Sequence, residues 1–479
     1  MLLNPIDFGD NPYLVGPHAP VRKELDKPSL KYVGQVPKDF SGIYLRNGPN
    51  QIHPPCGTYH WFDGDGMVHG VEFREGRVNY RNRWINTAGL KQEQKTGHSL
   101  WPGLMDPPNR SLQEAWGSDL CLKDNSNTDL TIHGGKAIST FYQCGEAYTL
   151  DPLSLETLGT LDLLSGGGRQ MSAHCMTDEQ SGDLLFFDYA TKPPYMTYGV
   201  FDKDANLVHH TAIDLPGARL PHTLAFTTNY SILMDLPMFW DPELLQKDVH
   251  KVSFYPDKAS RFGLITRFGQ GDSIKWFEAD PCYIYHAINS WEEGDVVILD
   301  VCRMSTPVPS EAKKQKLAGP YGSMLAWLKL DASYHRYRFN LVSGETKEES
   351  LSDLLSEFPV INNRFGGLSS RYSYHVTLAD TDAILFDGLV KIDSETTQNQ
   401  EYKFPKGCFG SESQFAPRDN AKNEDDGYLI TLVTNMETNK GEIQIFPAED
   451  ITQGPICRVI VPQQIPPGFH SSFVLPENL

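Results

Sequence analysis

The sequence predicts an all-β fold, and within that class a β-propeller. Short strand-like runs bounded by Gly, Asp, Asn or Pro recur along the whole chain, helix-like segments are sparse, and no change in composition marks a domain boundary. The 479 residues are enough for several blades. No tight repeat such as a WD motif is visible, so the prediction depends on strand count. A large β-sandwich and two separate β-domains are the alternatives.

The expected strands follow one another from one end of the chain to the other. Turns between them, such as NKGE, suit hairpins with glycine at positive φ. The clearest runs, in order, are SGIYLRN (41–47), GVEFREGRVNYRNRW (70–84), GDLLFFDYA (182–190), NYSILMDL (229–236), GDVVILDVC (294–302), DAILFDGLVKID (382–393), DGYLITLVTN (426–435) and KGEIQIFPAED (440–450). Helical signal is confined to SEAKKQKLAG (310–319) and, more weakly, KEESLSDLLSEF (347–358).

Composition and charge narrow the choice of partners. The net charge of −19 argues against a nucleic-acid partner and against electrostatic docking on anionic lipid, because both need clustered Lys and Arg. No signal-peptide pattern and no apolar stretch of about 18 residues is visible. The eight cysteines are scattered without a CxxC pair, which is typical of reduced thiols. We expect a cytoplasmic protein, a monomer or weak dimer, whose only membrane contact would be peripheral and apolar.

Two loops are apolar where loops are usually polar. HSLWPGLMDPP and DLPMFWDPELL contain prolines that exclude a central strand. One interpretation is that they pack into the core. The other is a patch for membrane contact or for entry of a lipophilic substrate, formed by Leu100, Trp101, Leu104, Met105, Met238, Phe239 and Trp240.

Four histidines share one sequence context, in which the histidine lies at a strand-compatible position next to a polar turn. They are His174, His222, His286 and His470. Any one of them alone is better explained as a core residue with a hydrogen-bond partner. Seven blades would contain roughly 68 residues each, so the four could lie on different blades and meet at the axis. A site with nitrogen ligands alone suits Fe(II), Zn, Cu or Ni.

Eight short motifs, in order, carry a resemblance to a known family. They are RNGPN, FDGDGM, SAH, PHTLAFT, HAINSWEE, SEFPVIN, EDDGYL and GFHSSFV. In this order, and across nearly the whole chain, they resemble the carotenoid cleavage oxygenases. The resemblance implies a seven-bladed β-propeller with a loop and helix dome over one Fe(II). It further implies a single domain over residues 1–479, with dome insertions including about 95–125 and 230–255, and His174, His222, His286 and His470 as iron ligands.

The same resemblance places the residues around the ligands. Three glutamates of the family accept the outer ring N–H of three ligands; here Glu357 and Glu412 match two of them, and Gln143 stands in the third position. Thr128 matches a threonine that crowds an open iron position. The resemblance implies no further catalytic residue.

The implied reaction is cleavage of a conjugated C=C bond by O2, which gives aldehydes or ketones. We expect an apocarotenoid or a similar lipophilic polyene as substrate. Stilbene-cleaving members of the family carry a lysine just before the third glutamate, and this chain has Tyr142 there. A stilbene or a phenylpropenoid such as a vinyl phenol is the alternative substrate. A non-catalytic β-propeller that binds a partner, with structural histidines, is the alternative from another class.

Overall fold

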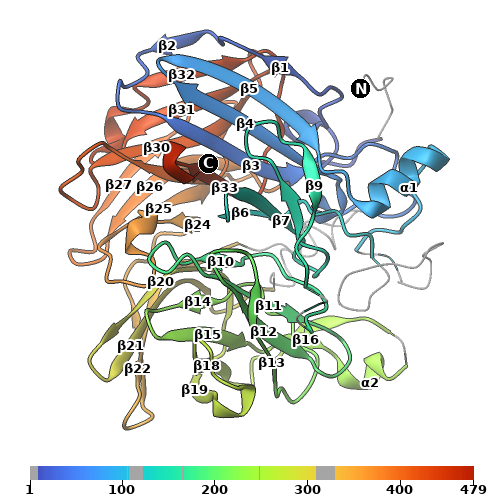
Figure 1. Ribbon diagram of the computed structural model, residues 1–479, viewed down its shortest axis with the longest axis vertical. Helices are drawn as coiled ribbons and strands as arrows, with labels where there is room; N and C mark the ends of the chain where they lie inside the picture. Colours follow the sequence, from blue (N-terminus) through green and yellow to red (C-terminus); the bar gives the residue numbers. More distant parts are fainter. Residues whose placement is uncertain are drawn as a thin grey trace.

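Seven antiparallel sheets surround a common axis in the computed structural model (Figure 1). The described residues are 9–104, 106, 122–163, 165, 167–247, 249–308 and 330–478. Each sheet is one blade, and the strand nearest the axis is connected through hairpins to the outer strands. The prediction of a seven-bladed β-propeller is therefore confirmed.

The blades are given in chain order, with the strand nearest the axis first. The closing blade contains β33 (Ser471–Val474), β3 (Gly42–Pro49), β4 (Gly66–Arg74), β5 (Arg77–Trp84) and β1 (Asp26–Lys27). The next two contain β6 (Asp129–His133), β7 (Lys136–Thr140), β8 (Tyr148–Leu150) and β9 (Thr157–Thr160), then β10 (Met176–Thr177), β11 (Leu184–Tyr189), β12 (Met196–Phe201) and β13 (Leu207–Ile213).

The fourth and fifth blades follow in the same manner. They contain β14 (Ala225–Phe226), β15 (Tyr230–Asp235), β18 (Ser260–Thr266) and β19 (Lys275–Ala279), then β20 (Tyr283–Glu293), β21 (Val296–Met304), β22 (Ser333–Asn340) and β23 (Thr346–Ser350). The sixth contains β24 (Glu357–Val360), β25 (Tyr372–Leu378), β26 (Phe386–Asp393) and β27 (Asn399–Lys403). The seventh contains β29 (Ser413–Pro417), β28 (Cys408–Phe409), β30 (Gly427–Asn435), β31 (Lys440–Pro447), β32 (Cys457–Val461) and β2 (Tyr32–Gly34).

The ring is closed by pairing between the two ends of the chain. The C-terminal strand β33 pairs with β3, with Ile43 opposite Val474, and β2 pairs with β32 at the outer edge of the last blade. Neighbouring inner strands contact one another, from β33 to β6 to β10 and from β14 through β20, β24 and β29 back to β33. Residues at the axis-side ends of these strands therefore lie close together although they are far apart in sequence.

Blade packing explains why the strand runs are continuously apolar rather than alternating. All residues of β11 and β30 are buried, because each blade packs against a neighbour on both faces. The outermost strands, such as β27, have exposed and half-buried residues in alternation.

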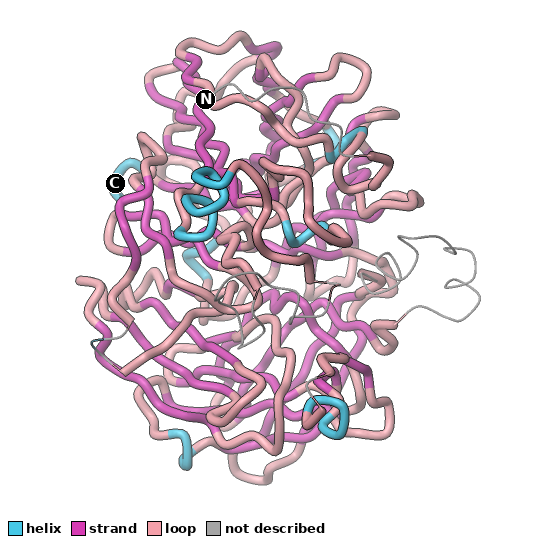
Figure 2. Tube along the Cα trace, turned by 90° about the vertical axis from the view of Figure 1, so that its right-hand side faces the viewer, coloured by secondary structure: helices cyan, strands magenta, loops and turns pink. Residues whose placement is uncertain are grey.

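Helices are few and short in the described structure (Figure 2). They are α1 (Ala88–Thr96), α2 (Pro242–Leu245) and the short 3-10 helices η1 (Gly16–His18), η2 (Trp61–Asp63), η5 (Gly271–Ser273), η6 (Asn363–Phe365), η7 (Ile451–Gln453) and η8 (Pro476–Asn478). None of the described helices is long and apolar enough to cross a bilayer.

Two helices were predicted from the sequence, over residues 310–319 and 347–358. The segment 310–319 lies outside the described residues, whereas the helix expected over 347–358 is wrong. There the chain forms the end of β23 and the start of β24, and Leu351, just after β23, and Phe358, in β24, enter the core. Strand pairing thus overrides the local helical spacing of the leucines.

The segments expected to form the dome lie partly outside the blades. Of residues 230–255, β15 belongs to a blade, whereas β16 (Met238–Trp240), α2 and β17 (Val252–Phe254) lie outside the seven blade sheets. Of residues 95–125, only 95–104, 106 and 122–125 are described. The assignment of a single domain with these insertions stays a prediction.

Candidate metal centre

The four histidines singled out in the sequence meet at the axis. The ring centroid of His174 lies 4.5 Å from the centroids of His222 and His470, and 5.0 Å from that of His286. All four residues are buried. They come from four blades, at or just before the inner strands β10, β14, β20 and β33. Blade geometry therefore brings together imidazoles that are widely separated in the sequence.

His286 reaches the axis because β20 is irregular at that position. The pairing of β20 with β21 shifts register between Ile284 and Ala287 and again before Asn289. Such bulges redirect a side chain out of the regular alternation. The His286 Nδ1–H donates to Glu357 Oε2 over 2.5 Å, and Glu357 is fully buried at the start of β24. This bond fixes the tautomer and leaves the Nε2 lone pair of His286 available.

The neighbouring His470, whose ring centroid lies 4.8 Å from that of His286, has the same arrangement. Its Nδ1 donates to Glu412 Oε1 over 2.9 Å, and the other carboxylate oxygen accepts the backbone N–H of Ser471 over 2.7 Å. The loop before His470 is held by the buried Arg46, whose guanidinium donates to the Pro466 carbonyl over 2.8 Å. The structure thus brings Glu357 and Glu412 each against one imidazole, and their role behind metal ligands stays a prediction.

His174 is held through its backbone rather than through its ring. Its φ of 63° lies in the left-handed region, which is unfavourable for a residue with a side chain. Its backbone N–H donates to Asp129 Oδ2 over 2.9 Å. Asp129, at the start of β6, was not recognised in the sequence, where NTD reads as an ordinary turn.

His222 is surrounded by aromatic side chains. Its ring centroid lies 4.7 Å from that of Tyr285 and 5.8 Å from that of Tyr142. Gln143 is buried next to Tyr142, and its amide makes a side-chain hydrogen bond to the Tyr142 hydroxyl. The role of Gln143 as an acceptor for the outer ring N–H of a ligand stays a prediction.

Thr128 connects the hairpin that carries Tyr142 to the loop that carries His470. Its hydroxyl accepts the Tyr142 backbone N–H over 3.3 Å, and its carbonyl accepts that of His470 over 3.3 Å. Thr128 is buried and bonds directly to the backbone of His470, and its crowding of an open iron position stays a prediction.

The electrostatics of the centre favour neutral imidazoles at His174 and His222, and carboxylates lie close to His470. Burial lowers the pKa of His174 and of His222 well below the ordinary value for histidine, and neighbouring imidazoles act in the same direction. Burial also acts to lower the pKa of His470, but the carboxylates, with Glu412 foremost, outweigh burial and raise it. Neutral imidazoles offer lone pairs, and the carboxylates behind them attract a cation.

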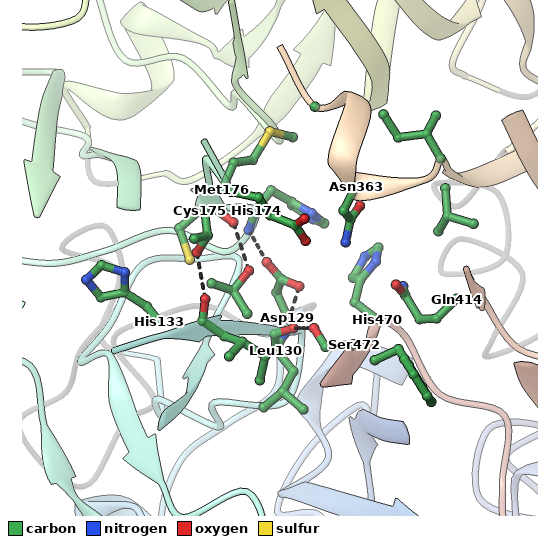
Figure 3. Close-up of a pocket in the computed structure, with 18 of the residues that line it drawn as sticks. Asp129, Leu130, His133, His174, Cys175, Met176, Asn363, Gln414, His470 and Ser472 are labelled. Carbon is green, nitrogen blue, oxygen red and sulfur yellow. Dashed lines mark hydrogen bonds between the residues drawn. The ribbon is translucent and has the colours of Figure 1, made fainter. Parts of the chain in front are cut away.

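A polar cavity of about 710 Å³ reaches the centre from one side (Figure 3). At its outer end are exposed residues such as Gly134, Lys203 and Glu477, and at its inner end are His174 and His470. Its other walls include Asp129, Thr131, His133, His286, Asn363, Arg364, Glu412 and Gln414. Water and ions could therefore approach the histidines along a polar wall.

Aromatic side chains cover another side of the centre. Phe62, in the FDGDGM motif, lies with its ring centroid 4.8 Å from those of Tyr142 and Phe469. The Phe358 ring lies 4.8 Å from His286 and 4.9 Å from His470. Aromatic rings line this side, in contrast to the polar cavity.

The apolar loops require a correction. Leu100, Trp101, Met238, Phe239 and Trp240 are buried, so they do not form an exposed membrane patch. Their prolines and hydrophobic side chains pack inward, as in the alternative interpretation of the sequence. Leu104 is half-buried, and Met105 lies outside the described residues.

Trp101 and Leu104 lie on the Tyr142 side of the centre. They line a narrow cavity of about 30 Å³ together with Phe62, Phe141 and Tyr142. One wall is formed by the buried Lys123, which pairs with Asp65 and, over 2.6 Å, with Glu93 of α1. A part in substrate entry stays a prediction for these two residues.

The donor set fits a divalent transition metal. Nε2 of His174 and of His286 are buried without a hydrogen-bond partner in the described structure, a costly state for a polar atom unless another group occupies it. Ligand atoms of His174, His222 and His286 lie within 4.8 Å of one another. Neutral nitrogen ligands backed by carboxylates are suited to Fe(II) among other metals.

Comparison with known proteins identifies the family. The family model described as RPE65, retinal pigment epithelial membrane protein, matches residues 18–475. A carotenoid 9,10(9′,10′)-cleavage dioxygenase of Crocus sativus is 32% identical over 98% of this chain and 90% of its own length. The chain belongs to the carotenoid cleavage oxygenase family.

Other relatives of this carotenoid cleavage oxygenase differ in their named substrates. An isoeugenol monooxygenase of Pseudomonas nitroreducens is 29% identical over 97% of this chain and 98% of its own length. The lignostilbene dioxygenase structure from Pseudomonas brassicacearum has a TM-score of 0.86 at 23% identity and covers 98% of this chain and 100% of that one. A Synechocystis apocarotenoid oxygenase structure has a TM-score of 0.81 at 25% identity, with 96% and 97% covered.

The named relatives are oxygenases, and this member of the family is an oxygenase as well. The family consists of non-haem iron enzymes, and the histidine cluster of this member is suited to hold a metal. The oxygenase relatives favour the enzyme over the alternative of a non-catalytic propeller.

Proposed function

We propose that this protein is a non-haem Fe(II) dioxygenase that cleaves a conjugated C=C bond of a lipophilic polyene. The observation that carries the proposal is the pair of buried imidazole nitrogens, Nε2 of His174 and of His286, left without hydrogen-bond partners at the axis. The overall change is R–CH=CH–R′ + O2 → R–CHO + R′–CHO. Both carbon atoms of the double bond are oxidised and O2 is reduced, so no other co-substrate is needed.

The iron would be held by His174, His222, His286 and His470, one ion per chain. When bound, it supplies O2 binding and the redox chemistry of the reaction. Glu357 and Glu412 keep two of the imidazoles in the tautomer that presents Nε2 to the metal. Gln143 is proposed as the corresponding acceptor for His222, through its amide oxygen.

The remaining side chains position the substrate and exclude water. Phe62, Tyr142 and Phe358 provide an apolar surface next to the histidines, against which a flat conjugated chain can lie. Thr128 fixes the backbone on either side of this surface and narrows the space at the metal. Holding one double bond in place lowers the entropic part of the barrier, and a dry wall protects the reacting groups.

The side chain at position 142 favours a substrate without a charged end. Burial raises the pKa of the Tyr142 hydroxyl, while its hydrogen bond with Gln143 acts in the opposite direction. A neutral tyrosine cannot pair with a phenolate as a lysine could. An apocarotenoid or similar polyene therefore fits the site better than an ionised phenol.

A stilbene or phenylpropenoid substrate is the second candidate. It is favoured by the isoeugenol monooxygenase relative, which is nearly as long as this chain and similar along its whole length. A neutral phenol could donate to or accept from the Tyr142 hydroxyl.

Product analysis separates these candidates. The anaerobically purified, iron-loaded protein is incubated with O2 and with an apocarotenal, 4-hydroxystilbene or isoeugenol. We expect aldehyde products from the apocarotenal at the highest kcat/KM. Preference for either phenol supports the second candidate, and no cleavage of any of the three by iron-loaded protein contradicts the proposed polyene and phenol substrates alike.

A further inference from the structure

Asp129 has a buried carboxylate whose two oxygens accept hydrogen bonds from backbone N–H groups. Its side chain is only 7% exposed, Oδ1 accepts the Leu130 N–H over 2.7 Å and Oδ2 accepts the His174 N–H over 2.9 Å. Among the described residues, no lysine or arginine forms an ion pair with it. A carboxylate that is buried among backbone N–H groups and the neighbouring His470 imidazole is costly in its charged form, and a nearby cation offsets that cost.

The position of Asp129 indicates which cation that would be. Ligand atoms of Asp129, His174 and His470 lie within 4.8 Å of one another. Figure 3 shows these three side chains pointing into the same part of the polar cavity. A cation held by the histidine cluster would therefore lie close to the Asp129 carboxylate.

The charges around the histidines lead to the same conclusion. Glu357 and Glu412 each bond to one imidazole, whereas the third acceptor position, Gln143, is neutral. With Asp129 the centre contains three buried carboxylates. Glu357 starts β24, Glu412 directly precedes β29, and Asp129 starts β6. Asp129 thus supplies a negative charge that Gln143 does not.

Asp129 also acts on the conformation of a ligand. The left-handed backbone of His174 is unfavourable for a residue with a side chain, and the Asp129 hydrogen bond is a contact that holds it there. Without this acceptor, the His174 ring is free to leave the axis.

We propose that Asp129 is a positioning residue of the metal centre, which fixes His174 and provides the third carboxylate charge in place of Gln143. This inference rests on the proposed function, since it takes the histidine cluster as the metal site. The consequence is that a negative charge added at position 143 can replace one removed at position 129 in metal binding, although the two residues lie on different segments of the second blade.

The test is a charge exchange between the two positions. Asp129→Asn removes the charge while keeping the shape and one acceptor oxygen, and Gln143→Glu adds a charge on the loop beside His222. Fe(II) affinity is measured anaerobically on stripped protein by competition with a chelator, and the visible spectrum with Co(II) reports ligand geometry. Asp204→Asn, in an exposed turn, is the matched control for loss of one negative charge.

We expect Asp129→Asn to weaken Fe(II) binding about 10- to 100-fold. The double variant Asp129→Asn/Gln143→Glu should recover most of this loss, and Asp204→Asn should bind as the wild type does. Asp129→Ala should further alter the Co(II) spectrum, because His174 loses its acceptor. Should Asp129→Ala fail to fold, the isosteric Asn variant and the double variant still decide the matter.

The outcomes separate this inference from the function on which it rests. If the wild type binds Fe(II) and Asp129→Asn binds it equally well, the role of Asp129 is wrong and the proposed metal site stands. If Gln143→Glu recovers nothing, the charge exchange is wrong. If the folded wild type binds neither Fe(II) nor Co(II), the proposed function itself fails.

Discussion

Glu357 Oε2 lies 2.5 Å from Nδ1 of His286, and both side chains are buried at the axis of the propeller. The same oxygen accepts the backbone N–H of Phe358 over 2.6 Å, and this second hydrogen bond holds the carboxylate in position for the imidazole. Phe358 in turn lies against the rings of His286 and His470. One short segment of β24 therefore orients one metal ligand and covers two.

Glu357→Gln should weaken metal binding about 10- to 100-fold with the fold intact. The amide can accept the imidazole N–H but carries no charge. Glu442→Gln is a matched control, because Glu442 is also buried and hydrogen-bonded but lies in β31, away from the axis. Iron content and Fe(II) affinity check the prediction, and equal metal loss in both variants would count against a specific role for Glu357.

Tyr142→Lys should shift selectivity toward phenolic substrates. A cation at this position can pair with a phenolate, and we expect kcat/KM for 4-hydroxystilbene relative to an apocarotenal to rise roughly tenfold, equivalent to about 1.4 kcal/mol. Tyr142→Phe, which removes only the hydroxyl, controls for packing and should not produce this rise. An unchanged ratio in Tyr142→Lys would place the polar end of the substrate elsewhere.

Asp124→Asn should flatten the dependence of stability on pH. Asp124 accepts the N–H groups of Ser126 and Glu146, and burial raises its pKa from 3.8 to about 7. The folded state therefore holds a proton that the unfolded state releases, and stability falls as pH rises from about 4 to about 7, by up to about 1.4 kcal/mol per pH unit.

Chemical unfolding at several pH values checks this sign. Burial also raises the pKa of Asp63 to about 7, so Asp124→Asn removes only part of the slope. The same slope in wild type and variant would show that Asp124 is ionised in the folded protein at low pH.

Trp240→Ala should destabilise the protein rather than alter membrane contact. Trp240 is 3% exposed, and truncation of a buried tryptophan costs about 3–5 kcal/mol. Phe268→Ala is the control, because Phe268 is 55% exposed and its loss should change the free energy of unfolding by less than about 0.5 kcal/mol. Loss of vesicle binding in Trp240→Ala at unchanged stability would restore the membrane-patch interpretation.

The sequence predicted those parts of the fold and centre that have a local signal. Runs such as VVILDVC predict strands because a blade packed on both faces needs continuous apolar residues, as β21 shows. His286 stood out because an imidazole interrupts an apolar run. The bulge that turns it toward the axis comes from strand pairing and has no local signal.

Other features depend on contacts between distant segments. Asp129 starts strand β6 and has no local sequence signal, and its place at the centre follows from contacts between distant segments. Helix α1 was missed although Thr87 caps its first turn and Gly97 ends it at φ 78°, signals that could have found it. The apolar loops were ambiguous because hydrophobic content does not say which way a loop packs.

We propose above all that the axis of this propeller holds one ferrous ion. The most direct measurement is the iron content of protein purified anaerobically under reducing conditions, with His286→Ala prepared in parallel. We predict about one iron per wild-type chain, and little in a His286→Ala variant that is still folded. A folded wild-type protein that contains no iron and takes up none on anaerobic addition of Fe(II) would contradict the claim.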